Sequence, residues 1–374
     1  MPAMQDLALE HLIDTVRAAA ARATPLHLCG GQTRHFFGQR PQGEPLRTTE
    51  LHGITSYEPS ELVVTVRSGT PLVELEALLA EQGQCLPFEP PRFGMPGQGT
   101  VGGMVAAGWS GPARASVGAV RDYVLGLTLL NGRGELLSFG GQVMKNVAGY
   151  DVSRLMAGAW GTLGVMTEIS LKVLPVAPAE ATLKFTCSQA QALAWLNTWG
   201  GQPLPLNASC WVDEAGVGTL YLRLRGAVAA VEAACRTLGG ERLDTATTAA
   251  DWTACRDQRL PWFTDRAADQ GLWRLSVPQT APVLALPVGV AAPLVEWHGG
   301  QRWVQAGADQ AQALCAAVAQ VGGHATLFQA AEADGAVTAS SLALPAPLQR
   351  IHQRLKAEFD PAGIFNRGGM SAGF

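Results

Sequence analysis

GMPGQGTVGGMVAAG, from Gly94 to Gly108, is the stretch of sequence that decides the fold of this chain. A second glycine-dense stretch, KNVAGYDVSRLMAGAWGTLGVMTEISLKVLP, runs from Lys145 to Pro175. Between them, VLGLTLLNGRGELLSF (Val124 to Phe139) predicts an apolar hairpin that turns at Asn131-Gly132. Glycine has no Cβ and tolerates positive φ, so such loops let the backbone approach a ligand and can form an anion-binding nest. The region therefore predicts a cradle for a large cofactor that carries phosphates.

The composition sets limits on the kind of protein. The chain has 374 residues, of which 47% are hydrophobic and 16% charged, and its formal net charge is −4. This length predicts two or three domains with a large core. The weak negative charge does not favour nucleic acid or an anionic membrane as a partner. The seven cysteines are dispersed without a CxxC spacing, so we expect no metal site and no iron–sulfur cluster held by this chain alone.

The same features predict a location. An odd, dispersed set of cysteines fits a reducing cytoplasm. Residues 1–23 contain acidic side chains and no long apolar run, which argues against a secretory signal. No apolar run approaches the roughly 18 residues that a membrane-spanning helix needs. We expect a cytoplasmic protein, with any peripheral membrane association arising through partners.

The N-terminal part of the chain has a second glycine loop. Residues 4–22 have helical apolar spacing and predict an amphipathic surface helix. LHLC (Leu26 to Cys29) predicts a short buried strand, and it leads directly into GGQTRHFFG, Gly30 to Gly38. A strand that enters a Gly-Gly pair is typical of a phosphate-binding loop. An ordinary tight turn is the alternative.

A nicotinamide-nucleotide motif is present in form only. Gly97, Gly99 and Gly102 spell G-x-G-x-x-G, which needs a strand just before it and a helix that opens at it. The preceding residues include Pro90, Pro91 and Pro96, which exclude a central strand. VGGMVAAGWSG, which follows, contains too much glycine to predict a helix. We therefore reject the nicotinamide nucleotide.

The rest of the chain predicts a second domain. Residues 165–173 alternate in character and predict a half-buried strand, and Pro175 and Pro178 mark a boundary. Residues 180–243 predict a β-α-β-β-α-β unit of the ferredoxin-like kind, and residues 272–328 repeat that plan weakly. The expected α+β architecture has a cofactor domain at 1–176, a cap at 177–345 with one antiparallel sheet and helices, and a segment at 346–374 that returns to the first domain.

Several of these motifs, in this order, resemble the FAD-binding domain of the vanillyl-alcohol oxidase/PCMH family. They are the strand and Gly-Gly pair near residue 30, PSELVVTV (59–66), GTVGGMVAAG (99–108) and the block at 145–175. The C-terminal FDPAGIFNRG (359–368) is similar to the closing FDPxGxxNPG loop of the family, with Arg367 in place of the usual proline. Together the motifs cover about half of the chain. The resemblance implies a PCMH-type domain of two α/β subdomains.

The resemblance also implies FAD as the cofactor and assigns residues to it. The first loop and Gly99–Gly103 would hold the pyrophosphate through backbone N–H groups, Gly161–Val165 would run along the flavin, and Asn366 would close the site. The residues expected to bind FAD are Gly30, Gly31, Gln32, Thr33, Pro96, Gly97, Gly99, Thr100, Val101, Gly102, Gly103, Gly161, Thr162, Gly164, Val165 and Asn366. His35 has no matching second attachment residue, so we expect FAD to be non-covalent. Lys145 and Asp151 also match family positions, and a helix cap or an ion pair is expected of them.

Within the family, the short length, the GGQTRHFFG loop and the compact cap are similar to the FAD-binding subunits of bacterial glycolate oxidase complexes. That likeness implies oxidation of glycolate to glyoxylate by a complex. It also implies two partners, a D-type flavoprotein subunit with the substrate site and an F-type iron–sulfur subunit that passes electrons on.

A complete substrate site is not evident. Oxidation of a 2-hydroxy acid needs a base for the hydroxyl proton and a cation or metal for the carboxylate. The histidine-rich metal motif of related catalytic subunits is absent, since no two histidines lie within four residues. His298, Arg302 and His324 are the weak catalytic candidates, and a hairpin tip with aromatic packing is the alternative for His298. Two other hypotheses stay open: an autonomous FAD-dependent 2-hydroxy-acid oxidoreductase, and a scaffold subunit without catalysis.

Overall fold

The computed structural model describes residues 2–34, 36–38, 42–141, 151–331 and 345–370. The chain divides into two compact units. The first unit comprises Met1–Trp109, Ala119–Val176 and Ala343–Phe374, and the second comprises Ser110–Gly118 and Ala177–Leu342. Ser110–Gly118 belongs to the second unit because its helix α4 (Arg114–Val117) packs on a strand of that unit, β11. The expected boundary at residue 176 does not separate this segment.

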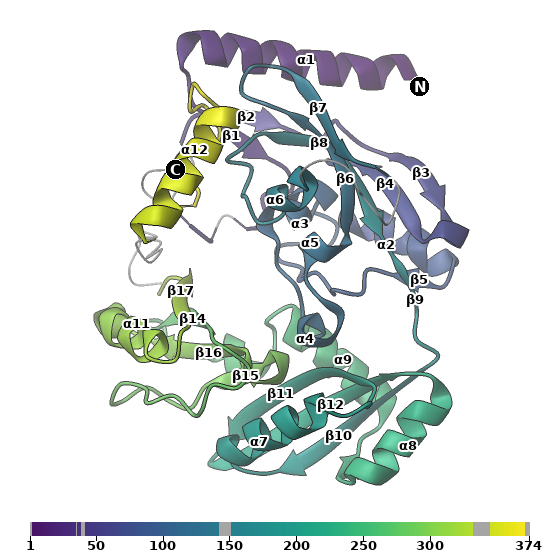
Figure 1. The fold of residues 1–374 in the computed structure, drawn as a ribbon, viewed down its shortest axis with the longest axis vertical. Helices are drawn as coiled ribbons and strands as arrows, with labels where there is room; N and C mark the ends of the chain where they lie inside the picture. Colours follow the sequence, from purple (N-terminus) through teal and green to yellow (C-terminus); the bar gives the residue numbers. More distant parts are fainter. Residues whose placement is uncertain (1, 35, 39–41, 142–150, 332–344, 371–374) are drawn as a thin grey trace. The chain divides into compact units, whose positions relative to one another are not determined.

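The first unit is built on a five-stranded antiparallel sheet, with the order β3-β4-β8-β6-β7 (Figure 1). The bounds are β3 Ile54–Glu58, β4 Val63–Arg67, β8 Val165–Lys172, β6 Val124–Leu130 and β7 Leu136–Gly140. β8 was expected to be half-buried. It is buried along both faces instead, because it is the central strand, where one face packs on the main core and Val165 packs on a second cluster.

A smaller layer carries the N-terminus. β1 (Leu26–Cys29) and β2 (Glu44–Arg47) form a two-stranded parallel sheet. The long helix α1 (Pro2–Arg22) confirms the expected amphipathic helix, and its side chains Leu12 and Val16 are buried with Leu26 of β1. This packing fixes β1, and therefore the start of the Gly30-Gly31 loop that follows it.

The glycine-rich segment after Thr100 does form a helix, α3 (Val101–Ala107), which corrects the expectation that it contains too much glycine. The hydroxyl of Thr100 caps it by accepting a hydrogen bond from the Gly103 N–H, and Val101, Met104 and Val105 lie in the core. A Cβ on Gly102 would lie 2.7 Å from the Cβ of Ser68. Tertiary packing therefore overrides the low helix propensity, and the glycine permits a close approach that a larger residue would prevent.

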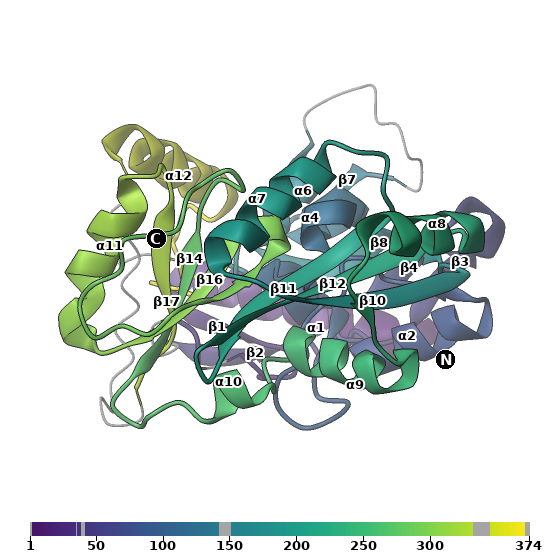
Figure 2. The same cartoon turned by 90° about the horizontal axis from the view of Figure 1, so that it is seen from below.

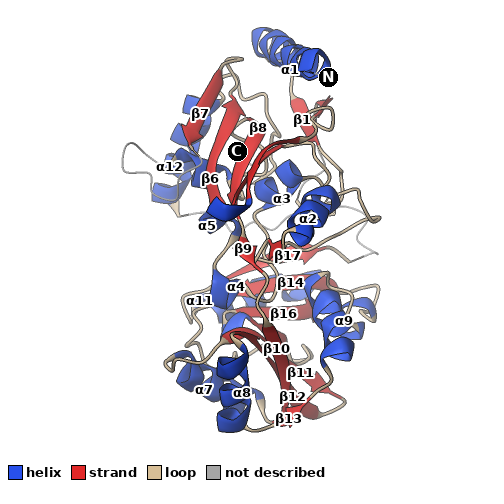
Figure 3. Cartoon of the chain, turned by 90° about the vertical axis from the view of Figure 1, so that its right-hand side faces the viewer, coloured by secondary structure: helices blue, strands red, loops and turns tan. Residues whose placement is uncertain are grey.

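Short elements complete the first unit. They are η1 (Pro59–Glu61), α2 (Leu72–Glu81), α5 (Val120–Tyr123), α6 (Val152–Met156), and the two-stranded pair β5 (Gln84–Cys85) and β9 (Leu174–Pro175). The C-terminal helix α12 (Ala346–Phe359) returns to this unit (Figure 3), and the carbonyl of its last residue accepts a hydrogen bond from the Gly132 N–H at the turn between β6 and β7. The rings of Phe139 and Phe359 meet there edge to face, with centroids 6.3 Å apart.

The second unit contains one eight-stranded antiparallel sheet, with the order β13-β10-β12-β11-β15-β16-β14-β17. Its first half has the elements β10 (Ala179–Thr186), α7 (Gln189–Gly200), β11 (Leu206–Glu214), β12 (Val217–Gly226), α8 (Val228–Leu238) and β13 (Glu241–Arg242). α7 and α8 cover one face of these strands, and α9 (Thr245–Arg256) lies on the other (Figure 2). Element order and strand order are those of the expected ferredoxin-like unit.

The second half of this sheet repeats the strand order and joins the first half through β11 and β15. Its elements are β14 (Gly271–Ser276), β15 (Leu294–Glu296), η2 (Trp297–Gly299), β16 (Gln301–Ala306), η3 (Ala308–Gln310), α11 (Ala311–Ala319) and β17 (His324–Gln329). Irregular chain takes the place of a first helix between β14 and β15. The short helix α10 (Pro261–Thr264) precedes this half. No helix in the described part of the chain is long and apolar enough to cross a membrane.

Candidate cofactor-binding site

A cavity of about 350 Å³ lies within the first unit, where the glycine loops of the sequence meet. It is lined by the loop after β1, the start of α3, the segment before β8 and the C-terminal loop. The residues expected to bind cofactor that line it are Gly30, Gly31, Gln32, Thr33, Thr100, Gly102, Gly103, Gly161, Gly164, Val165 and Asn366. Segments far apart in sequence are therefore brought together at one cavity.

The first and second glycine loops are in direct contact. A Cβ on Gly31 would lie 1.5 Å from the carbonyl oxygen of Gln98, and a Cβ on Gly30 would lie 2.7 Å from Oγ1 of Thr100. No larger residue fits at Gly31 without moving backbone, since real side chains do not approach that closely. The loop at Gly30-Gly31 and the loop at Gln98–Thr100 thus form the two sides of one cradle.

Five residues expected at the cofactor do not line the cavity. Pro96 and Gly97 are exposed, and Val101 is fully buried in the core of the first unit. The carbonyl of Gly99 accepts a hydrogen bond from the Leu72 N–H, and the Thr162 hydroxyl donates to the Ala159 carbonyl. Cofactor contact at Pro96, Gly97, Gly99, Val101 and Thr162 stays a prediction.

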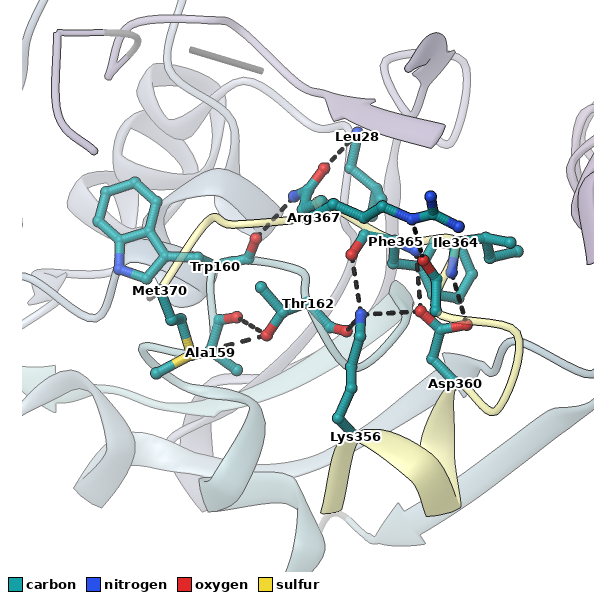
Figure 4. A network of polar contacts seen from close by, with 12 residues as sticks. Leu28, Ala159, Trp160, Thr162, Lys356, Asp360, Ile364, Phe365, Arg367 and Met370 are labelled. Atoms are coloured by element: carbon teal, nitrogen blue, oxygen red, sulfur yellow. Dashed lines mark hydrogen bonds and ion pairs between the residues drawn. The ribbon is translucent and has the colours of Figure 1, made fainter. Parts of the chain in front are cut away.

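Asn366 ties the C-terminal loop to the cavity wall. Its side-chain oxygen accepts from the Leu28 N–H at 2.8 Å, and its amide nitrogen donates to the Trp160 carbonyl at 2.7 Å (Figure 4). Its backbone N–H also donates to the Leu26 carbonyl. Asn366 adopts φ of 39°, in the left-handed region that asparagine tolerates better than most residues. One side chain therefore fixes β1 and the Trp160-Gly161 segment at their correct separation.

Two buried charges hold that loop in shape. Asp360 is 1% exposed and accepts hydrogen bonds from the Ile364 and Phe365 N–H groups. Lys356 donates to Asp360 at 2.8 Å and to the Thr162 carbonyl at 2.6 Å, as Figure 4 shows. Burial lowers the pKa of Lys356, and the nearby carboxylate of Asp360 partly offsets this. The ion pair of Lys356 and Asp360 thus holds the loop at residues 359–366 in the conformation that positions Asn366.

Glycines in the third segment have conformations that the cavity requires. Gly161 has φ of 67°, and a Cβ there would lie 3.0 Å from the side-chain nitrogen of Asn366. Gly164 has φ of 153°, and its Cβ would lie 2.8 Å from the Leu130 carbonyl oxygen. Both positions are left-handed or nearly extended with positive φ, where other residues are strained.

The cavity has polar groups whose hydrogen bonds the protein leaves unmade. Nε of Arg34 and Oγ of Ser68 are buried without a hydrogen-bond partner among the described residues, and both residues line the cavity. A buried unpaired polar group costs free energy unless a ligand completes it. A nest of glycine backbone together with such donors fits a phosphate-bearing cofactor of the FAD kind. Arg34 could have been found from the sequence, as a basic residue inside the first glycine loop, whereas no sequence pattern points to Ser68.

The electrostatics of the cavity favour an anion. Among the described residues that line it, none is Asp or Glu, and Arg34 and Arg367 contribute positive charge. Burial lowers the pKa of Arg34 to about 10, which leaves the guanidinium protonated at neutral pH. Burial also lowers the pKa of His27, whose imidazole is therefore neutral there.

Aromatic rings form one wall of the same unit. Phe37 and Trp160 line the cavity and stack with centroids 4.8 Å apart. Trp109 meets both edge to face and also carries the guanidinium of Arg34 over its ring at 5.7 Å. Such a wall suits the planar ring of a flavin, and these rings were not predicted from the sequence.

The catalytic candidate His298 is held inside the second unit. Its ring nitrogens lie 3.0 Å from the hydroxyls of Ser116 and Ser209, and its backbone has φ of 53°. Burial lowers its pKa to about 4, so the ring is neutral at pH 7. Trp297, next to it, packs on the guanidinium of Arg114 at 4.6 Å and donates to the Gly111 carbonyl. The tip between β15 and β16 thus anchors the Ser110–Gly118 segment, and aromatic packing at a hairpin tip describes it well.

The other two candidates are also accounted for locally. Arg302 is fully buried, and its guanidinium donates to the carbonyls of Gly299, Pro282 and Ala281. His324 lies at the start of β17 and is exposed as a whole residue. Partial burial of its ring, together with the nearby charge of Arg274, lowers its pKa. A catalytic role for any of the three stays a prediction.

The remaining predicted positions have simpler outcomes. Asp151 caps α6, where its carboxylate accepts from the Arg154 N–H and pairs with the Arg154 side chain. Lys145 and His35 lie outside the described residues. Among the residues that the structure describes, no group of three or more His, Cys, Asp or Glu is placed to hold a metal ion. A second cavity, of about 660 Å³, lies in the second unit and contains none of the predicted site residues.

The fold and the cradle define a flavoprotein of the FAD-linked oxidoreductase class, and the comparisons agree. Residues 8–140 match the model of an FAD binding domain. Over 96% of this chain and 97% of the relative, the sequence is 43% identical to glycolate oxidase subunit GlcE of Escherichia coli (strain K12). The chain belongs to the GlcE-type family of FAD-binding proteins, and its cofactor is FAD.

More distant relatives share only parts of the chain. Glycolate oxidase subunit GlcD of Bacillus subtilis (strain 168) is 30% identical over 43% of this chain and 33% of its own length. A D-lactate dehydrogenase of Anaerostipes hadrus is 36% identical over 36% of this chain and 27% of its own length. A solved structure of alkyldihydroxyacetonephosphate synthase matches with a TM-score of 0.65 and 14% identity, over 96% of this chain and 74% of that one, which shows a common fold.

Proposed function

We propose that this chain is the FAD-binding subunit of a complex that oxidises glycolate to glyoxylate. The observation that carries the proposal is the end-to-end similarity to a glycolate oxidase subunit, at 43% identity over 96% of the chain. The cradle formed by Gly31 and Thr100, and the absence of carboxylates among the described residues that line it, support the view that this chain still binds FAD. The first unit would be the FAD domain, and the second unit, with Ser110–Gly118, would be the cap.

The residues of this chain would hold the cofactor in three ways. Backbone groups of Gly30–Thr33 and Gly102-Gly103 would take the diphosphate, the segment around Gly161–Val165 would run along the flavin, and Asn366 would fix the closing loop. When bound, FAD would supply a redox centre that can take up two electrons and pass them on. The aromatic wall at Trp160 would exclude water from the ring.

We assign the complete oxidation of glycolate to the complex and not to this chain alone. A pKa of about 4 makes His298 a weak base, and both of its ring nitrogens contact serine hydroxyls. The Arg302 guanidinium donates to three backbone carbonyls. We therefore do not assign the general base or the carboxylate anchor to these two residues. A D-type flavoprotein subunit would provide the substrate site. The two electrons would leave through an F-type iron–sulfur subunit. The complex would work in the cytoplasm, with any membrane association arising through these partners.

Co-expression with the two partner subunits tests the proposal. The expected result is a stable three-component complex in which this chain carries one FAD and glycolate reduces flavin. The isolated chain should retain FAD but show no bleaching of its absorbance with glycolate or D-lactate. Bleaching of the isolated chain would establish an autonomous oxidoreductase, and a colourless chain that takes up no FAD on titration would establish a scaffold. A monomer that ignores both partners would overturn the proposal.

A further inference from the structure

Arg34 has the surroundings of a ligand-binding residue rather than of a structural one. One guanidinium nitrogen donates to the Pro91 carbonyl at 3.3 Å, and the guanidinium lies over the Trp109 ring. Nε is buried without a partner among the described residues. The side chain is therefore held in one orientation by two contacts while part of its hydrogen-bonding capacity faces no protein group.

The position of Arg34 indicates which kind of ligand would pair with its guanidinium. The residue follows Thr33 in the first glycine loop, and its NH1 is 3.6 Å from where a Cβ of Gly103 would lie. It therefore touches both sides of the cradle formed by Gly31 and Thr100. The described cavity lining holds no carboxylate that could pair with Arg34, and an anionic ligand would supply that countercharge. A guanidinium fork matches phosphate oxygens in shape and charge.

We propose that Arg34 binds the FAD diphosphate and offsets one of its two negative charges, and that it makes the site selective for a flavin dinucleotide over a flavin without phosphate. The glycine nest alone supplies oriented dipoles, which bind an anion without cancelling its charge. Arg367, the other arginine at the cavity, is exposed and donates to the carbonyls of Gly363 and Ala23. These two bonds account for the guanidinium of Arg367, whereas the contacts of Arg34 leave its Nε unpaired.

Equilibrium titration of the deflavinated full-length chain with FAD, ADP and riboflavin tests the assignment. ADP carries the diphosphate without the flavin, and riboflavin carries the ring without phosphate. Arg34→Met keeps the length and apolar packing of the side chain but removes its charge. We expect it to weaken FAD and ADP binding roughly 10- to 100-fold, the size of a lost charge-assisted hydrogen bond, and to leave riboflavin affinity unchanged. Arg34→Lys should lose less, about 3- to 10-fold.

The matched control is Arg92→Met, because Arg92 is an exposed arginine nearby that pairs with Glu76 and does not line the cavity. It should bind all three ligands as the parent chain does. Equal losses for FAD and riboflavin with ADP unaffected would place Arg34 at the flavin ring and overturn the proposal. Unchanged FAD affinity in Arg34→Met would also overturn it. If Arg34→Met does not fold, Arg34→Lys decides the question, because the proposal requires that this variant lose affinity for FAD and ADP but not for riboflavin. The inference rests on the FAD site and holds whether or not the chain joins a complex.

Discussion

Two arginines, one in each unit, show how differently the two halves of this chain use buried charge. Burial lowers the pKa of Arg34 and of Arg302 to about 10 in each case. The guanidinium of Arg302, on β16, donates hydrogen bonds to three backbone carbonyls. That of Arg34 donates to one, and its buried Nε has no partner among the described residues. The same residue type therefore completes the fold in the second unit and is left available in the first.

The contrast extends to the surroundings of each arginine. Glu296 of the second unit is buried and accepts hydrogen bonds from Gln301, Trp303 and the Cys255 thiol. Ser68 of the first unit is buried and has an unpaired hydroxyl at the cavity. Buried polar groups that are satisfied by the fold stabilise it, and those left open cost stability that a ligand can restore. Both units contain buried polar atoms without a partner among the described residues, such as Gln189 Nε2 in the second, but only in the first do such atoms, those of Arg34 and Ser68, belong to residues that line the cofactor cavity.

Gly31→Val should have the largest effect. Its Cβ would lie 1.5 Å from the Gln98 carbonyl oxygen, so the two sides of the cradle would be forced apart. We expect a loss of stability on the order of 4 kcal/mol and no FAD uptake, measured by thermal melting and flavin absorbance. Gly200→Ala is the control from the other unit, since a Cβ there meets nothing within 4 Å. Normal FAD content in Gly31→Val would show that the two loops do not form the cradle.

Arg302→Met should cost about 3 kcal/mol of stability, because three buried carbonyls lose their donor. FAD affinity should not change, the reverse of what Arg34→Met does. Urea unfolding followed by fluorescence gives the stability, and FAD titration gives the affinity. A variant with parental stability but without glycolate oxidation in the assembled complex would instead make Arg302 a substrate-binding residue, and would erase the contrast between the two arginines.

Asn366→Ala should cost about 2 kcal/mol, since it removes the hydrogen bonds to the Leu28 N–H and the Trp160 carbonyl. Because those bonds position the cavity wall, FAD affinity should fall together with the melting temperature. Saturating FAD should recover part of the lost stability by mass action. Equal melting shifts with and without FAD would mean that the closing loop does not contribute to the site.

Acid should destabilise the second unit through His298 by about 1 kcal/mol between pH 7 and pH 5, a value reduced for its partial exposure. The pKa is 6.5 in an unfolded chain and about 4 when the ring is buried, so the unfolded chain binds more protons in that window. Stability is therefore fully present above pH 6.5 and falls as the pH drops toward 4. His298→Gln should flatten this dependence. An unaltered pH profile in His298→Gln would place the acid-sensitive group elsewhere.

The sequence predicted the order of the elements and the two-loop cradle because these depend on local patterns. Apolar periodicity located α1 and α2, and glycines at fixed spacing located the loops that meet at the cavity. Prediction failed where a contact distant in sequence decided the outcome. α3 forms in spite of its glycines because Gly102 packs on Ser68, and β8 is buried because two core clusters, formed by segments distant in sequence, pack against its side chains.

For the site, the glycine-dense stretches by themselves predicted a cradle for a phosphate-bearing cofactor, because glycine lets the backbone approach a ligand, and the resemblance to a known family implied that this cofactor is FAD. The resemblance also implied that Asn366 closes the C-terminal motif, although not that its two bonds join β1 to Trp160. Only the tertiary structure decided which buried polar groups are satisfied. Arg34 and Arg302 look alike in sequence, because pairing depends on carbonyls that the fold brings near, up to 57 residues away for Arg34 and 21 for Arg302.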